Sequence, residues 1–203
     1  VRKGPIVLTL LLFLCLVLIV VLVVRKNNYS GASCKPPKRN SSSATGIELL
    51  CALNVEKEYL GKPYIRKMFG YESDIDNDGQ WTRAEILARD STVAVTAEWR
   101  RGRLYILTGH WISPLDNDSY LYSFDVQVDH LVALKEAWES GAWRWPSKSL
   151  KLFANDQEYP TLTVMSKEMN NSKGDQDFAE WKPENATCWY AQMWLLTKYR
   201  WNL

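Results

Sequence analysis

The stretch Phe124–Leu134 reads Phe-Asp-Val-Gln-Val-Asp-His-Leu-Val-Ala-Leu, and its periodicity changes in the middle. From Tyr120 to Val128 the residues alternate in polarity, as is typical of a strand. From Leu131 to Ser140 apolar residues return at helical spacing. The change predicts a strand followed by a helix, with Asp129 and His130 at the junction.

The segments on either side of this junction predict a mixed α+β fold. Val93–Trp99 and Leu104–Trp111 are rich in β-branched and aromatic residues, and the Arg-Arg-Gly turn between them favours a hairpin. Thr161–Met165 predicts a further strand. Helices are expected over Gly46–Leu60, Lys148–Ala154 and Glu184–Tyr199.

The 203-residue chain is expected to form one globular domain after its N-terminal part. Residues 6–24 carry no charge and, at about 19 residues, are long enough to span a bilayer. The absence of an Ala-x-Ala cleavage site favours an uncleaved anchor, although a signal peptide stays open. We therefore expect a signal anchor or signal peptide over residues 1–26, a flexible linker over residues 27–45 and an exported domain over residues 46–203, which is either secreted or anchored with the domain outside the cell.

An exported location permits disulfides, and the chain has four cysteines. Cys15 lies within the apolar segment, and Cys34 lies in a linker rich in Lys, Pro and Ser. The preferred pair is therefore Cys51 with Cys188.

Charge alone does not identify a nucleic-acid-binding protein. Without Arg2 and Lys3, the 25 basic residues of the chain are reduced to the same number as its 23 acidic residues. Nucleic-acid binding would have to depend on local basic segments, of which Arg100–Arg103 is the strongest. A solvated turn explains that segment equally well.

An acidic segment, Asp74–Glu85, matches the calcium loop of an EF-hand at several positions. Carboxylates at alternate positions converge on one cation, Gly allows the sharp turn, and a terminal Glu closes the ligand shell. The candidate ligands for a structural Ca²⁺ are Asp74, Asp76, Asp78, Gln80 and Glu85. The alternative is an acidic turn that caps the helix following it.

Two polar segments that are far apart in the sequence carry the chemistry of interest. The first is Asp129–His130, and the second is Asn170–Asp175, on a segment predicted to be rich in turns. A hard metal and a neutral imidazole base are what hydrolysis of a phosphodiester by water requires. The chain has two histidines, and His110 is expected to serve packing alone.

Several sequence blocks resemble, in the same order, the exported HNH-type nucleases and the C-terminal nuclease domain of GmrSD-type restriction enzymes. The blocks are Asp74–Gly79, Thr82–Leu87, Arg89–Ser91, Val128–Leu134, Ala137–Trp143, Phe153–Asp156, Asn170–Asp175, Glu180–Pro183 and Cys188–Tyr190. Together they run from about Tyr71 to the end of the chain.

The resemblance implies a ββα-metal core, with helices inserted between its two strands. It implies that His130 is the general base of a metal-dependent endonuclease, and that Asp129 and Asn170 hold Mg²⁺, or else Mn²⁺ or Ca²⁺. The base and both oxygen donors are expected to converge around one ion. Lys173 or Arg83 would contact phosphate, and Asp175 would orient a ligand.

The implied substrate is nucleic acid, DNA rather than RNA, with little sequence specificity. Glycosylation sequons begin at Asn28, Asn40, Asn117, Asn170 and Asn185, and a glycan on Asn170 would remove a metal ligand. The alternative is a non-catalytic, membrane-anchored binding module for carbohydrate or protein, stapled by calcium, in which the ten tryptophans supply a binding platform. Their simpler role is core packing.

Overall fold

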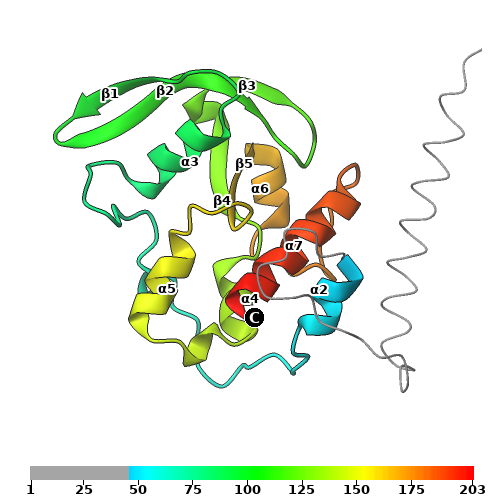
Figure 1. The fold of residues 1–203 in the computed structure, drawn as a ribbon. Coiled ribbons are helices and arrows are strands. Elements are labelled where there is room, and N and C mark those ends of the chain that lie inside the picture. The colour runs from blue at the N-terminus through cyan, green and yellow to red at the C-terminus, as the bar shows by residue number, and fades with distance from the viewer. Residues whose placement is uncertain (1–45) are drawn as a thin grey trace, which may run out of the picture. The chain divides into compact units, whose positions relative to one another are not determined.

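The computed structural model describes residues 46–203 (Figure 1). The predicted membrane or signal segment, the linker, Cys15, Cys34 and the sequons at Asn28 and Asn40 lie outside the described residues. Among residues 46–203, none of the helices combines the length and apolar character needed to cross a bilayer.

The domain has the predicted α+β class. Its elements, in chain order, are α2 (Gly46–Ala52), η1 (Arg66–Phe69), α3 (Thr82–Asp90), β1 (Thr96–Arg100), β2 (Arg103–Ile112), β3 (Ser119–Tyr122), η2 (Ser123–Asp125), β4 (Val126–His130), α4 (Leu134–Glu139), η3 (Ala142–Arg144), α5 (Ser147–Ala154), β5 (Leu162–Ser166), α6 (Lys167–Lys173) and α7 (Thr187–Trp201).

The predicted hairpin is confirmed, and it forms part of an antiparallel sheet in the order β1-β2-β3. Arg101 and Gly102, in the turn, both have positive φ, 51° and 75°. Two successive positive φ angles match the twist of the strands that a short hairpin joins. The Gly in the Arg-Arg-Gly segment is therefore a conformational requirement of the hairpin.

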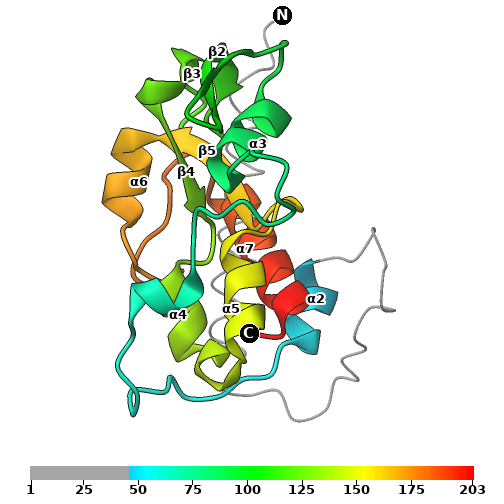
Figure 2. The same cartoon turned by 90° about the vertical axis from the view of Figure 1, so that its left-hand side faces the viewer.

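A second sheet consists of β4 and β5, paired antiparallel with His130 opposite Leu162. Helix α3 packs against one side of this pair and α6 against the other, as Figures 1 and 2 both show. The apolar side faces α3, where Val126, Val128 and Val164 pack with the buried side chains of the helix. This packing fixes which side chains of β4 point toward α6.

The end of β4 and the start of β5, which pair with each other, adjoin a helical region built from α4, α5, α7 and η1 (Figures 1 and 2). Its core contains Phe69, Trp138 and Phe153, with Trp145 and Trp201 packed against it. Many of the tryptophans therefore serve packing, as burial of aromatic surface favours.

Both cysteines of the described residues, Cys51 and Cys188, are disulfide-bonded. They lie on α2 and α7, which pack against each other. Their pairing with one another stays a prediction.

Three predicted elements differ from the structure. The opening helix ends at Ala52 rather than Leu60. The single strand predicted over Tyr120–Val128 is divided into β3 and β4 by the short helix η2. The segment that carries Asn170, predicted to be rich in turns, is the helix α6, whose first turn is capped by the Ser166 hydroxyl accepting from Met169 N.

Candidate functional site

The alternation of β4 divides Asp129 from His130. Successive side chains of a strand point to opposite faces, so Asp129 follows Gln127 toward α6, while His130 follows Val128 toward the other face. The contacts agree, because Asp129 pairs with Lys173 at the end of α6 and His130 bonds to Ala154 at the end of α5.

Asp129 and Lys173 form a buried ion pair. Lys173 Nζ lies 2.9 Å from Asp129 Oδ2, and the exposed fractions of the two side chains are 0% for Lys173 and 19% for Asp129. The ammonium also donates to Gly174 O at 3.2 Å. The pair brings the second polar segment of the sequence beside the first, and it neutralises an ammonium that would be costly to bury alone.

The His130 imidazole is held in one orientation. Its Nε2 lies 3.0 Å from the carbonyl oxygen of Ala154, and its ring stacks on Phe153 with centroids 5.7 Å apart. A carbonyl oxygen only accepts hydrogen bonds, so Nε2 carries the proton and Nδ1 keeps a lone pair.

Burial keeps this imidazole neutral. His130 is 6% exposed, and loss of hydration lowers its pKa from 6.5 to about 4, against an opposing effect of the Asp129 carboxylate. A neutral ring with an unprotonated Nδ1 is what a general base requires at neutral pH.

Asn170 lies one helical turn before Lys173 on α6, so the two side chains share a helix face. Asp129 and Asn170 thus offer oxygen donors on the α6 side of β4. The imidazole of His130 does not join them, because it turns toward α5. The expected convergence of all three side chains around one ion is therefore wrong for His130.

Arg83 and Asp175 have other partners within the domain. Arg83 donates to the carbonyl oxygens of Ser123 at 2.8 Å and Val126 at 3.1 Å, and burial lowers the pKa of its guanidinium. It thereby fixes η2 and the start of β4 against α3. Asp175 pairs with Lys135 at 3.2 Å.

The acidic loop brings three of its five candidate ligands together. Carboxylate oxygens of Asp74, Asp76 and Asp78 all lie within 4.8 Å of one another. Asp74 accepts from the backbone N–H of Asn77 at 2.7 Å and of Gly79 at 2.9 Å. These bonds close the loop around the carboxylates.

The other two candidate ligands lie differently. The side-chain amide of Gln80 donates to Asp78 at 2.6 Å. Glu85 stands outside the group of three, and its Oε2 is buried without a hydrogen-bond partner among the described residues. Burial raises the pKa of Glu85, and the carboxylates of the loop add to the effect.

The surroundings of His110 agree with the structural role expected of it. It is partly exposed on β2, and its Nδ1 hydrogen-bonds to the Thr92 hydroxyl. It stands apart from the groups around β4 and provides a natural control for His130.

Two polar groups were not identified from the sequence. Lys198 on α7 pairs with the buried Glu136 and donates to Ser140 Oγ at 2.6 Å. Asp156, after α5, binds Arg200 and Trp201 at the end of α7. Lys198 and Glu136 are 62 residues apart in the sequence, and Trp201 and Asp156 are 45 residues apart, so local spacing gives no signal of these contacts.

Comparisons with known proteins give a relative of similar length. No protein-family model matches the chain, and no solved structure matches it. A protein of Arthroderma benhamiae named "Uncharacterized secreted protein" is 32% identical over 169 residues, which cover 82% of this chain and 80% of the relative.

Proposed function

This chain belongs to the family of that Arthroderma benhamiae protein, and we propose that it is a metal-dependent endonuclease hydrolysing phosphodiester bonds in nucleic acid. The observation that carries the proposal is the contact of Lys173 Nζ with Asp129 Oδ2 at 2.9 Å. It places the helix bearing Asn170 beside the strand that ends in Asp129–His130. In this proposal β4, β5 and α6 form an HNH-like ββα-metal core.

His130 acts as the general base. With its Nε2 proton donated to Ala154 O, the lone pair on Nδ1 accepts a proton from the attacking water. The pKa of about 4 keeps the ring unprotonated across the neutral range. The imidazole need not bind the metal for this role, which fits its position on the other face of β4.

Asp129 and Asn170 would hold the metal. Carboxylate and carboxamide oxygens suit a hard cation such as Mg²⁺, Mn²⁺ or Ca²⁺, and the Asp129 carboxylate is partly open to solvent. When bound, the ion supplies positive charge that stabilises the phosphate as the bond breaks. Lys173 already faces the same carboxylate, so it donates to a phosphate only after leaving Asp129.

Substrate binding would depend on the phosphate backbone. The resemblance to HNH-type nucleases favours DNA over RNA as the substrate. Little sequence specificity is expected, because no base-reading motif accompanies the site. Arg83 is a positioning residue in this proposal, since its hydrogen bonds to Ser123 and Val126 already engage its guanidinium. Because the relative is named as secreted, we extend an extracellular location to this chain.

A calcium-stapled binding module is the second candidate. The convergence of Asp74, Asp76 and Asp78 within 4.8 Å favours it. Exposed aromatic side chains, among them Trp99 and the stacked pair Tyr122 and Phe124, supply a surface for a carbohydrate or protein partner. In this alternative His130 is a structural residue that stacks on Phe153.

A plasmid-nicking assay separates the two candidates. Wild type, His130→Ala and His110→Ala are compared with Mg²⁺ and with EDTA. The nuclease proposal predicts metal-dependent nicking that His110→Ala retains and His130→Ala lowers by at least about a hundredfold, the contribution of a general base. Equal background nicking in all three proteins would reject the nuclease and leave the binding module.

A further inference from the structure

The connection from α5 to β5, residues 155–161, lies beside the end of β4 that carries His130. Ala154, just before it, supplies the carbonyl that accepts from the ring. Thr161, at its end, accepts from the backbone N–H of Leu131 at 3.0 Å. The last residue of α5 therefore binds His130, and the end of the connection binds the residue after it, so the connection flanks the Ala154 carbonyl.

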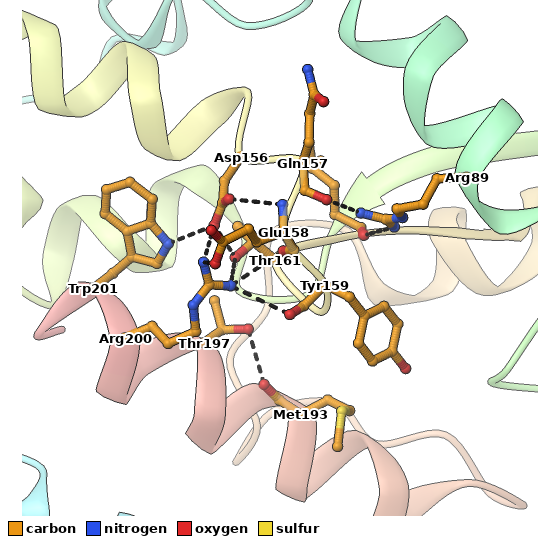
Figure 3. Close-up of polar contacts among 11 residues, drawn as sticks. Arg89, Asp156, Gln157, Glu158, Tyr159, Thr161, Met193, Thr197, Arg200 and Trp201 are labelled. Carbon is orange, nitrogen blue, oxygen red and sulfur yellow. Dashed lines mark hydrogen bonds and ion pairs between the residues drawn. The ribbon is translucent and has the colours of Figure 1, made fainter. Parts of the chain in front are cut away.

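Asp156 binds this connection to the end of α7 (Figure 3). Its Oδ2 accepts from Thr161 Oγ1 at 2.6 Å and from Trp201 Nε1 at 2.9 Å, and it lies 3.2 Å from the Arg200 guanidinium. Its Oδ1 accepts from Glu158 N at 2.9 Å. One carboxylate, whose side chain is 9% exposed, thus joins both ends of the connection to the last turns of α7.

Arg200 adds further bonds to the same backbone. Its guanidinium donates to the carbonyl oxygens of Glu158 at 3.2 Å and Tyr159 at 3.4 Å. From the opposite side, Arg89 on α3 donates to the carbonyl oxygens of Gln157 at 2.5 Å and Leu162 at 2.6 Å. Figure 3 shows the connection between these two arginines.

Charge-assisted hydrogen bonds of this kind are stronger than neutral ones, and partly buried networks are rigid when every member is satisfied. No helix or strand covers residues 155–161, so side-chain bonds hold the segment in place. The buried Asn155 fixes its start by accepting from Ser73 N and Thr82 Oγ1 and by donating to Gly70 O and Lys151 O, and Asp156 with the two arginines fixes the rest. The fixed position of the Ala154 carbonyl thus depends on side chains that do not touch His130.

We propose that Asp156, bound by Arg200 and Trp201, is a positioning residue that holds the Ala154 carbonyl against the His130 ring and so keeps its proton on Nε2. The catalytic value of this positioning rests on the proposed nuclease function, because only then does the lone pair on Nδ1 accept a proton. The tautomer itself does not depend on that function.

Nuclear magnetic resonance tests the proposal directly, because the chain has two histidines. In protein labelled with ¹⁵N at histidine, each of the two imidazole rings gives its own set of nitrogen signals. The sets are assigned with the variants His130→Gln and His110→Ala. In a single tautomer, the protonated and unprotonated nitrogens of one ring have widely separated ¹⁵N shifts. Wild type should show that separation for His130, with Nε2 protonated.

Asp156→Asn should bring the two His130 shifts toward each other, because the ring then exchanges between tautomers. The matched control is Glu158→Gln, which removes the other carboxylate partner of Arg200. Its ion pair with Arg200 is 2.7 Å long, but the Glu158 side chain is 81% exposed, so the His130 shifts should stay as in wild type. Folded Asp156→Asn with unchanged shifts would overturn the proposal.

Trp201→Phe is the second, milder variant. It keeps an aromatic ring in the core and removes one hydrogen bond to Asp156. If Asp156→Asn fails to fold, Trp201→Phe should still show a smaller movement of both shifts, and unchanged shifts there would overturn the proposal. Nicking activity measured on the same samples tests the nuclease function separately: moved shifts in a protein without activity would retain the positioning and reject the nuclease.

Discussion

Two candidate cation sites of this domain, at the end of β4 and in the acidic loop, treat their carboxylates in opposite ways. At the end of β4, Asp129 is paired with the fully buried Lys173. In the acidic loop, Asp74, Asp76 and Asp78 converge with no lysine or arginine in an ion pair with any of them among the described residues. At the first site a lysine already balances the carboxylate, whereas the second concentrates like charges that a cation would relieve.

The difference teaches that convergence of oxygen atoms is a weak guide to the use of a metal. The acidic loop closes through hydrogen bonds from backbone N–H groups to Asp74. The β4 site buries the Lys173 ammonium, so a change there is expected to affect stability as well as activity.

The largest expected effect comes from breaking the buried pair. Asp129→Ala leaves the Lys173 ammonium buried without its carboxylate, and should lower the free energy of unfolding by about 3 to 5 kcal/mol. Urea denaturation measures the loss. Asp76→Ala, in the exposed loop, is the matched control and should change stability by less than about 1 kcal/mol. The double variant Asp129→Leu/Lys173→Met should recover much of the loss. Equal losses of stability in Asp129→Ala and Asp76→Ala would contradict the difference drawn between the two sites.

The next largest effect is the response of His130 to acid. Its pKa is about 4 in the folded protein and 6.5 when unperturbed, so the unfolded chain binds the proton more readily. The contribution of the neutral His130 ring to the free energy of unfolding is therefore complete above pH 6.5. It is lost as the pH falls toward 4, by up to about 3 kcal/mol. The free energies of unfolding of wild type and His130→Gln, measured by urea denaturation and plotted against pH, should converge over this range. Parallel curves would show that the ring titrates normally in the fold.

Calcium should stabilise the fold mainly through the acidic loop. At ten to a hundred times its dissociation constant, Ca²⁺ should stabilise the protein by about 1 to 3 kcal/mol. Thermal unfolding should show this increase in wild type and in Asp129→Asn, and should show none in the double variant Asp76→Ala/Asp78→Ala. An increase that survives in the loop variant would place the calcium elsewhere.

The smallest expected effect is glycosylation of Asn170 on α6. Asn117 and Asn185 are exposed, whereas Asn170 is partly buried on the helix face that it shares with Lys173. In a host that glycosylates exported proteins, peptide mass spectrometry should find glycans at Asn117 and Asn185 and little or none at Asn170. Full occupancy of Asn170 would remove it as a metal ligand.

Local signals predicted the elements that depend on neighbouring residues. The Arg101–Gly102 turn and the end of β4 at His130 are examples. The division of the strand predicted over Tyr120–Val128 was missed, because Arg83 fixes η2 through bonds to Ser123 and Val126 from a distant helix.

Helix α6 was missed for a different reason. Asn, Ser and Gly have low helix propensity, and their side chains or backbone freedom favour turns. The helix instead depends on the Ser166 cap and on packing against β4 and β5.

At the candidate site, the sequence indicated Asp129, His130 and Lys173, but it did not indicate that the Ala154 carbonyl binds the ring or that the Asp129 carboxylate binds the ammonium. The strand alternation that separates Asp129 from His130 follows from the period of two. The bond from His130 to Ala154 and the role of Arg200 do not, because these residues are joined by tertiary contacts alone.

The burial of Lys173 has a practical consequence for chemical labelling. An amine with no exposed surface should react slowly with acylating reagents, while the surface lysines of the domain are modified quickly. Anything that draws the Asp129 carboxylate away would release that amine, so the acylation rate of this one lysine would report occupation of the strand end without any need for a substrate.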